Sequence, residues 1–313
     1  MEIIYNKIFL EHETGSHPEN KKRLEVFGKL KEQEIIDGSN FLKKIYSLEY
    51  IDFIQKRGES DGFLDADTLV SGQSYKTACF AVGASIMASE TGSFALIRPP
   101  GHHAGINKGG GFCLLNNIAI ASKRLTEKGK KVFILDIDGH HGNGTQEIFY
   151  NSNKVFYFSI HQYPAYPGTG WLDEIGKEKG KFYNINIPLP PESGDDLFLK
   201  SIIDFLPFVK KFKPDVVAFS AGFDGHWADP LLNLNFSLNS YYQLGKIISK
   251  NFDNIFAVLE GGYNLSYLPK CVYNFIAGLN QEKIKFEEKA TISRATVKEE
   301  YQKRIVQLKN FYN

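Results

Sequence analysis

The stretch that most constrains this chain runs from residue 131 to residue 146 and reads KVFILDIDGHHGNGTQ. Its apolar run is rich in β-branched and aromatic residues and lacks helical spacing, which is typical of a strand buried on both faces in a parallel sheet. The polar residues that follow the run are Asp136, Asp138, His140 and His141. Because ligands bind at the carboxyl ends of strands in open α/β sheets, the stretch predicts a central strand with a site at its end.

The spacing of the polar residues favours a metal. Asp138 and His140 are two positions apart, so they project from the same side of an extended chain, as two ligands of one metal would. The alternative is that Asp136 and Asp138 cap a helix expected at 145–150 and that the histidines are ordinary loop residues. The motif alone does not decide between the two, so the rest of the chain has to.

Strands and helices alternate through most of the chain. Strands are expected at 2–5, 94–98, 131–136, 155–160, 183–189, 215–221 and 255–259. Helices are expected around 22–30 and at 73–90, 113–128, 145–150, 195–213 and 238–251. This order predicts an α/β fold in which one parallel sheet carries helices on both faces. No Pro/Gly/Ser-rich linker divides the 313 residues, so we expect a single domain over 1–313, with 281–313 as a charged C-terminal helical segment.

Composition excludes several other classes of protein. A net charge of +1 argues against an extended phosphate-binding surface, so no direct nucleic-acid partner is expected. No apolar run reaches the roughly 18 residues of a membrane span, and charges at Glu2, Lys7 and Glu11 interrupt any signal-peptide core. The three cysteines are far apart and never form a CxxC pair, which favours a reducing, cytoplasmic location.

Unusual residues end four of the expected strands, in the motifs GHH, DIDGHH, SAGFD and EGGY. If the sheet is parallel, these ends share one rim. Asp138, His140 and Asp224 would there supply two carboxylates and one imidazole, and a catalytic metal would keep an open position for water or substrate. This donor set suits zinc but also accepts iron(II), cobalt(II) or manganese(II). Taken alone, Asp224 is equally well explained as a helix N-cap.

Acid–base chemistry has candidates at the same rim. An imidazole near a metal-bound water can act as general base and then general acid, and His102 and His103 are framed by Pro and Gly. Asp136 and Asn143 are available to orient the two imidazoles. Tyr263 follows two glycines and would place its hydroxyl over the open coordination position, where it donates to an oxyanion. On its own, Gly-Gly-Tyr is also typical of a turn with a packed ring.

Several longer motifs now point to a known family. They are RPPGHHAG at 98–105, GGGFCLLNNIAIA at 109–121, LDIDGHHGNGTQEIFY at 135–150, HQYPAYPGTG at 161–170, SAGFD at 220–224 and LEGGYN at 259–264, preceded by HPEN at 17–20 and LDADT at 64–68. In these motifs and their order, the chain resembles the histone deacetylase superfamily over about residues 3 to 280. The resemblance is to the bacterial and archaeal members close to the class II enzymes.

The resemblance implies an arginase-deacetylase fold and a set of catalytic roles. The implied zinc ligands are Asp138, His140 and Asp224. His103 would act as base and then acid, with His102 as an electrostatic partner oriented by Asp136. Tyr263 would polarise the acetyl carbonyl.

The resemblance also implies a substrate channel and a second ion. Gly111, Phe112 and Tyr166 would line a narrow channel for the alkyl chain of an acetylated amine. Asp65 would match a rim aspartate that anchors the substrate's backbone. A structural potassium ion is usual in the family, and its implied neighbours are Asp136, Asp138, His140 and Ser159.

Two departures from the class I pattern are common among class II-like members. Asn143 stands where class I enzymes have Asp, and Gly139 replaces a larger apolar residue. Tyr263 is kept, whereas a subgroup with weak activity on acetyl-lysine has His there. The expectation is therefore a competent zinc-dependent deacetylase that hydrolyses the N-acetyl amide of lysine or a related alkylamine and releases acetate.

Three alternatives stay open beside this expectation. An acetylpolyamine or other small-molecule amidohydrolase would favour acidic rim residues, and Pro230, Leu231 and Leu232 supply none. An arginase-like hydrolase needs a second metal and more aspartates than SAGFD offers. A non-catalytic module that binds acetyl-lysine fits poorly with the retention of all ligands, both histidines and Tyr263. The sequence does not define an oligomeric state.

Overall fold

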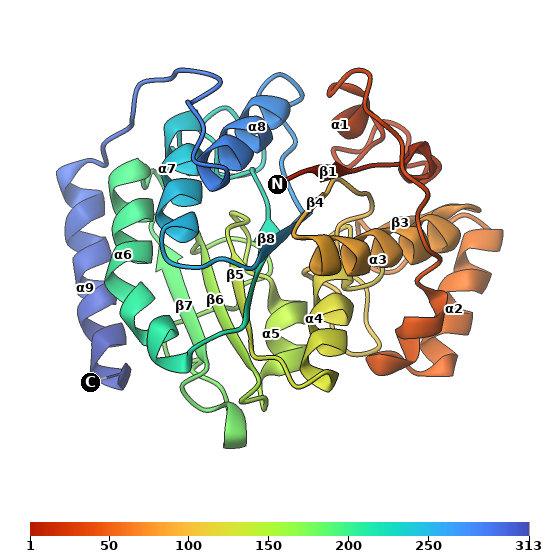
Figure 1. Cartoon of the computed structure of the whole chain (residues 1–313), viewed down its shortest axis with the longest axis horizontal. Helices are drawn as coiled ribbons and strands as arrows, with labels where there is room; N and C mark the ends of the chain where they lie inside the picture. The colour runs from red at the N-terminus through yellow and green to blue at the C-terminus, as the bar shows by residue number, and fades with distance from the viewer. Residues whose placement is uncertain (313) are drawn as a thin grey trace.

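A seven-stranded sheet forms the centre of the computed structural model, which describes residues 1–312 (Figure 1). The strand order is β1-β4-β9-β8-β5-β6-β7, and every neighbouring pair runs parallel. The strands are β1 (Ile3–Ile4), β4 (Phe94–Ala95), β5 (Val132–Asp136), β6 (Val155–Gln162), β7 (Asn184–Leu189), β8 (Val216–Ala221) and β9 (Ile255–Leu259). A separate antiparallel pair consists of β2 (Gly62–Phe63) and β3 (Leu69–Val70). The predicted parallel α/β sheet is confirmed.

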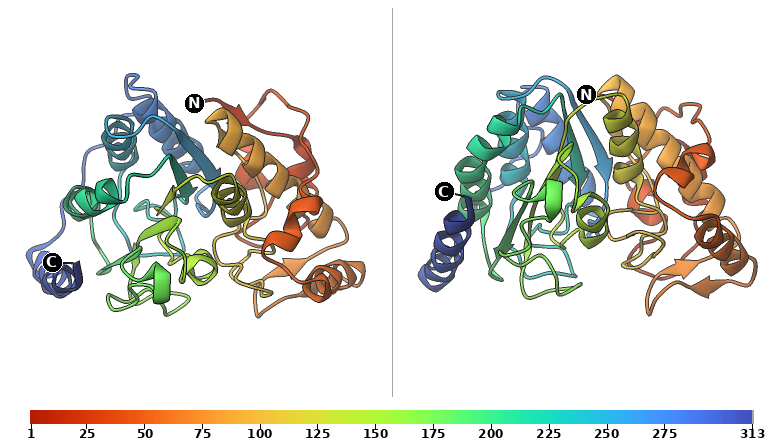
Figure 2. Two further views of the ribbon diagram at one scale, coloured as in Figure 1. Left: turned by 60° about the horizontal axis from the view of Figure 1, so that its bottom comes forward. Right: turned by 90° about the horizontal axis from the view of Figure 1, so that it is seen from below.

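Helices cover both faces of the sheet, as predicted (Figures 1 and 2). One face carries α3 (Ser74–Thr91), α4 (Asn117–Glu127) and α5 (Asn143–Phe149), and the other carries α6 (Asp195–Phe212), α7 (Leu238–Ser249) and α8 (Leu268–Leu279). The remaining helices are α1 (Lys22–Glu25), α2 (Leu48–Glu59) and α9 (Ala295–Tyr312), with 3-10 turns η1 (Lys7–Leu10), η2 (Ser39–Lys44) and η3 (Glu178–Gly180). The order of elements places the loops after β4, β5, β8 and β9 along one rim.

The central strand β5 is buried along its whole length between β6 and β8. Asp136 is in register with Ser159 on one side and with Ser220 on the other. The three strands therefore end at nearly the same level. The chain segments that leave β5 and β8 start side by side, which brings residues far apart in sequence to one place.

The helix α3 precedes β4 and packs on the sheet beside β4 and β9. Its small residues allow close approach, because a Cβ on Gly83 would lie 1.8 Å from the Ile36 carbonyl oxygen. Gly92 ends the helix in the left-handed conformation at φ +68°, which glycine adopts without steric cost.

Two expected helices are shorter than predicted. The one around residues 22–30 is the single turn α1, because the chain turns away at Gly28, where φ is +73°. Leu24 and Phe27, whose three-residue spacing is compatible with a helix, are still buried, so the spacing here reflects burial in an irregular segment. The helix expected from residue 113 starts at Asn117, because the Asn116 side chain caps it by accepting from the Ala119 N–H at 3.0 Å.

The charged C-terminal segment ends in the helix α9, which lies beside α6 and β7 (Figure 1). Tyr301, Ile305 and Leu308 are buried on one side of it, and Arg304 donates to the Pro188 carbonyl at 3.0 Å. The segment is thus a docked helix with one charged face, and its last residue, 313, lies outside the described residues. Among residues 1–312, no helix combines the length and the apolar character that crossing a membrane requires.

Candidate active site

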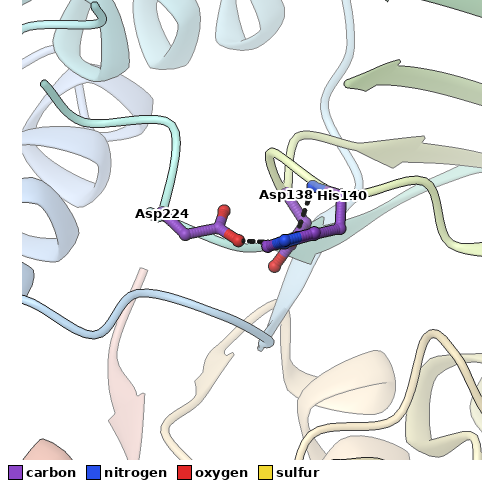
Figure 3. A group of neighbouring side chains, drawn as sticks. All are labelled: Asp138, His140 and Asp224. Carbon is purple, nitrogen blue, oxygen red and sulfur yellow. Dashed lines mark hydrogen bonds and ion pairs between the residues drawn. The ribbon is translucent and has the colours of Figure 1, made fainter. Parts of the chain in front are cut away.

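The three predicted metal ligands meet at the rim of the sheet (Figure 3). One ligand atom each from Asp138, His140 and Asp224 lies within 4.8 Å of the others. The His140 Nδ1 is 2.6 Å from Asp224 Oδ2 and 3.4 Å from Asp138 Oδ1. The structure thus brings the three residues together, and their role as metal ligands stays a prediction.

Backbone N–H groups hold the two carboxylates in place. Asp138 Oδ2 accepts from the Gly261 N–H at 2.7 Å, and Asp224 Oδ1 accepts from the Gly139 N–H at 2.6 Å. The chain also passes very close, since a Cβ on Gly222 would lie 1.9 Å from Asp138 Oδ2. Glycine is required there, and the carboxylates are preorganised before any ligand arrives.

The charges of this cluster are unbalanced. Burial raises the pKa of Asp138, but His102 and His140 lower it more, and the carboxylate stays ionised. Burial lowers the pKa of His140, but Asp224 and Asp138 raise it more, to about 10. Two carboxylates thus share one imidazole in a buried place. Two carboxylates and one imidazole are the donors that a divalent ion of the zinc type prefers, so the residues fit such an ion.

The paired histidines lie beside this cluster with different partners. His102 Nδ1 donates to Asp136 Oδ2 at 3.2 Å, and His103 Nδ1 donates to the Asn143 Oδ1 at 2.8 Å. Their ring centroids are 4.0 Å apart. Asp136 and Asn143 are therefore the orienting partners that the sequence predicted.

The environment separates the two histidines electrostatically. Burial lowers the pKa of His102, but Asp138 and Asp136 raise it more, to about 10. Burial, with the positive charges of His102 and His140, lowers the pKa of His103 well below its ordinary value. One imidazole is thus held as a cation and its neighbour as a neutral base.

Tyr263 is placed by contacts on its ring and its backbone. Its ring lies edge-on to Phe112, with centroids 5.7 Å apart, and under the Arg23 guanidinium, 4.9 Å from its carbon. Its backbone N–H donates to Asp229 Oδ2 at 2.6 Å. Burial raises the pKa of the Tyr263 phenol well above its ordinary value, so the hydroxyl stays a donor.

The predicted channel residues surround His103. The Tyr166 ring centroid is 5.0 Å from that of His103, and Gly111 sits between them, since its Cβ would lie 2.5 Å from His103 Cδ2. Phe112 adopts φ +70° and packs edge-on against His17 at 4.5 Å. These residues are grouped as expected, with Tyr166 47% exposed at the outer end.

Asp65 lies at the channel wall, and its anchoring of a substrate stays a prediction. Its Oδ2 accepts from the Gly111 N–H at 3.0 Å, and its Oδ1 accepts from the Thr68 N–H at 2.7 Å. It ties the loop before β3 to the channel wall. The neighbouring carboxylate of Asp67 is exposed, and sequence reasoning did not single it out. The acidic repeat in LDADT was the available signal.

The predicted potassium neighbours are also close together. Ser159 is buried and pairs in register with Asp136, and its hydroxyl is 2.8 Å from His161 Nδ1. Asp136, Asp138 and His140 follow on the adjacent strand end. Occupation by potassium remains a prediction.

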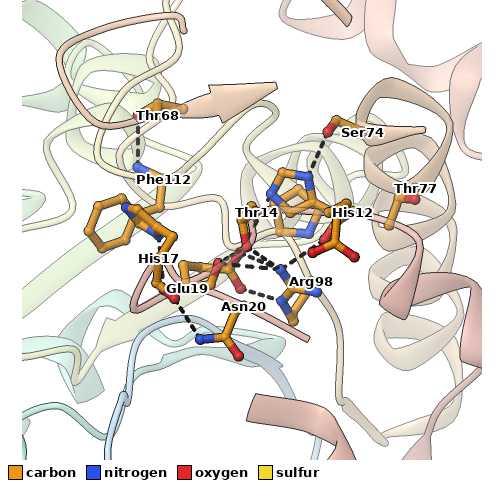
Figure 4. A network of polar contacts seen from close by, with 12 residues as sticks. His12, Thr14, His17, Glu19, Asn20, Thr68, Ser74, Thr77, Arg98 and Phe112 are labelled. Atoms are coloured by element: carbon orange, nitrogen blue, oxygen red, sulfur yellow. Dashed lines mark hydrogen bonds and ion pairs between the residues drawn. The ribbon is translucent and has the colours of Figure 1, made fainter. Parts of the chain in front are cut away.

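A second buried charged network surrounds Glu19 and Arg98 and was not anticipated (Figure 4). Glu19 Oε1 accepts from Arg98 Nε at 2.5 Å and from an Arg23 terminal nitrogen at 3.0 Å. Arg23 also donates to the carbonyls of Glu260 at 2.5 Å and Gly262 at 2.7 Å. The arginines in HPENKKR and RPPGHH carried no spacing signal, because their partners are remote in sequence.

Comparisons with known proteins agree with this geometry. Residues 17–279 match the histone deacetylase domain family. A probable deacetylase of Archaeoglobus fulgidus is 38% identical over 291 residues, which cover 84% of this chain and 81% of that protein. The solved structure of the HDA15 HD domain has a TM-score of 0.89 at 30% identity and covers 99% of this chain and 96% of its own. An acetylpolyamine aminohydrolase from Burkholderia pseudomallei has a TM-score of 0.81 at 26% identity, covering 90% and 98%. The predicted arginase-deacetylase fold is confirmed.

Proposed function

The chain belongs to the histone deacetylase family, and from that premise we propose that it hydrolyses the N-acetyl amide of lysine or a related alkylamine and releases acetate. One observation carries the proposal. The buried cluster of Asp138, His140 and Asp224 lies next to two imidazoles that are oriented by different partners. A metal-binding cluster beside a neutral, oriented base is the arrangement that amide hydrolysis requires.

Asp138, His140 and Asp224 would hold the metal, with His140 binding through Nδ1. The donor set favours zinc and admits iron(II), cobalt(II) or manganese(II). When bound, such an ion supplies Lewis-acid polarisation and lowers the pKa of water. The structural potassium predicted near Ser159 is retained as part of the proposal.

The chain's own residues perform the proton transfers. His103 is neutral and has its Nε2 free, since Nδ1 is bonded to Asn143, so it takes the proton of the attacking water and later gives it to the leaving amine. His102, a cation on Asp136, provides positive charge beside it. Tyr263 donates its hydroxyl to the developing oxyanion.

The channel selects an extended alkylamine. Gly111 leaves room beside His103 where a side chain would collide, and Phe112 and Tyr166 supply apolar walls. Outside it, Asp65 would anchor the substrate's backbone, because each of its carboxylate oxygens can accept a further hydrogen bond beside the backbone N–H that it already holds.

A single assay tests the proposal. Zinc-loaded protein is given an acetyl-lysine peptide or an N-acetylpolyamine at equal concentration, and acetate is measured. We expect turnover of the peptide to exceed that of the polyamine, because Pro230, Leu231 and Leu232 bring no carboxylate that would attract a polycation. A preference for the polyamine would assign the enzyme to small-molecule metabolism instead. Release from neither substrate would overturn the deacetylase assignment.

The remaining alternatives are separated by two further measurements. One metal per chain supports the deacetylase, and two would support a ureohydrolase. Tyr263→Phe removes one hydroxyl, and we expect kcat to fall roughly 100- to 1,000-fold, the usual loss of an oxyanion donor. Unchanged turnover would refute the assigned role, and absence of any turnover in the wild type with retained peptide binding would favour a non-catalytic acetyl-lysine module.

We also infer that residues 1–313 act as one catalytic domain, because strands of the same sheet come from residues 3 and 259. Limited proteolysis followed by mass spectrometry tests this, and two separately stable fragments would contradict it. The cytoplasmic location predicted from the unpaired cysteines is kept as part of the proposal.

A further inference from the structure

Glu260 is a fully buried carboxyl group that the reaction as described does not use. We propose that it is a positioning residue that fastens the loop of His102 and His103 to the ends of β8 and β9. The inference rests on the proposed function, since it concerns the same site. In this role, Glu260 would keep the general base His103 and the oxyanion donor Tyr263 at a fixed distance from each other.

The contacts of Glu260 connect three neighbouring strands. It directly follows β9, which lies between β4 and β8 in the sheet. Its Oε2 accepts from the N–H groups of Gly101 at 2.6 Å and His102 at 3.1 Å, in the loop after β4. Its Oε1 accepts from the Ser220 hydroxyl at 2.8 Å, near the end of β8. One side chain thus spans the chain segments that carry the base and the ligand Asp224.

The main chain on either side of Glu260 is held as firmly as its side chain. Arg23 donates to the carbonyls of Glu260 and Gly262, and the Gly261 N–H donates to Asp138. The Tyr263 loop therefore has few ways to shift. Because Glu260 is fixed in that loop, its hydrogen bonds from the N–H groups of Gly101 and His102 also hold the loop that carries His102 and His103 in place.

Hydrogen bonding, and not charge, is what this role needs. Burial raises the pKa of Glu260 to about 7, with His102 acting in the opposite direction. The oxygen that faces Gly101 and His102 accepts in either protonation state, and the other oxygen can exchange roles with the Ser220 hydroxyl. A glutamine offers the same pattern, with its carbonyl toward the two N–H groups and its NH₂ toward Ser220.

The test compares Glu260→Ala with Glu260→Gln in the metal-loaded full-length protein. We expect Glu260→Ala to lower kcat about 30- to 100-fold with little change in KM, because misplacement by about 1 Å costs a catalytic group about that much. Glu260→Gln is expected to recover most of kcat. Metal content, measured by elemental analysis, should stay at the wild-type value in both variants. If Glu260→Gln loses as much activity as Glu260→Ala, or KM carries the loss, the positioning role is refuted.

A second readout does not depend on turnover. Hydrogen exchange followed by mass spectrometry should show faster exchange in residues 98–105 of Glu260→Ala and wild-type protection in Glu260→Gln. Unchanged protection in Glu260→Ala would overturn the proposal, whatever the activity. Failure of the wild type to release acetate from any substrate would instead count against the proposed function and leave this measurement valid.

A matched control exists at the start of α6. Asp195 is also buried, and its carboxylate accepts from the Ser237 N–H at 2.7 Å and from the Thr291 hydroxyl at 3.1 Å, so its hydrogen bonds go to residues outside 98–105. Asp195→Ala should lower thermal stability without changing kcat or the exchange of residues 98–105. Equal kinetic losses in Asp195→Ala and Glu260→Ala would show a general structural effect and refute the specific role of Glu260.

Discussion

Two buried charged clusters act on Tyr263, one through Arg23 and the other through Asp138 and Asp224, and they are built differently. Around Glu19, one carboxylate meets two arginines, and all three side chains are at most 1% exposed. At the rim, Asp138 and Asp224 share a single imidazole, His140. In the first cluster fixed arginines outnumber the carboxylate, whereas in the set of three predicted metal ligands the carboxylates outnumber the imidazole.

The difference separates a structural network from a binding site. A buried charge is tolerated when fixed partners surround it, and removal of one partner exposes the others to the full cost of desolvation. The excess of acid at the rim is instead suited to a mobile cation from solution. Hydrogen bonds from Gly139 and Gly261 hold the rim acids together until it binds.

The largest expected effect is at the rim. Asp138→Ala removes one ligand, so we expect loss of the bound metal and a fall in kcat/KM of roughly 1,000-fold or more, since the ion supplies several kcal/mol. Elemental analysis and acetate release measure both. If Asp138→Ala lost its metal but kept the activity of the wild type, the rim cluster would not be the metal site that distinguishes it from the Glu19 cluster.

Glu19→Gln should destabilise the fold through the other cluster without removing a metal ligand. It removes the charge that faces Arg23 and Arg98, and we expect the free energy of unfolding to fall by about 3 to 5 kcal/mol. Denaturant unfolding measures it. The control Asp52→Asn breaks the exposed pair with Lys56, and no measurable change is expected there. A neutral result for Glu19→Gln would mean that its network is not structural.

Arg23→Lys tests whether the Glu19 cluster helps to position Tyr263 at the active site. Arg23 bonds to Glu19, to two carbonyls of the Tyr263 loop and to the ring of Tyr263, and a lysine cannot reproduce this planar fork. We expect kcat to fall about 10- to 100-fold, as for partners that orient a site indirectly. Metal content should not change. Loss of stability with full kcat would confine Arg23 to the structural cluster.

A further expected effect is a pH dependence of stability. Burial lowers the pKa of His12 to about 4, with Glu19 acting in the opposite direction. The unfolded chain therefore binds the proton first, so His12 reduces stability as pH falls from about 6.5 to about 4, by up to about 1.4 kcal/mol per pH unit. His12→Gln should reduce the slope of the unfolding free energy against pH by that amount between pH 6.5 and 4. An unchanged slope would refute the assignment.

Glu19 acts at lower pH with the same sign. Burial raises its pKa, but Arg98 lowers it more, to about 2, below its ordinary value of 4.5. Its stabilisation is complete above about pH 4.5 and is lost as the pH falls toward 2. In Glu19→Gln, the loss of stability between pH 4.5 and 2 that this carboxylate causes should be absent.

Much of the site was predictable because its ligands follow strands. The run ending in Asp136, Asp138 and His140 predicted both a buried strand and a rim site, and SAGFD placed Asp224 beside it. Parallel pairing alone brings such ends together. The orienting bonds of His102 and His103 could also be predicted, because Asp136 and Asn143 lie within the same motif as the ligands.

The sequence by itself determined the sheet, the rim and the donor set, because burial period and strand ends are local properties of the chain. Only the tertiary structure decided which acidic side chains form hydrogen bonds within the chain and which face solvent. It engaged Asp65 and left Asp67 exposed, and it joined Glu19 to Arg98, 79 residues apart. It also gave Glu260 its partners, 159 and 158 residues away. Hydrogen bonds between remote segments leave no periodic pattern in a sequence, so their partners are set by packing.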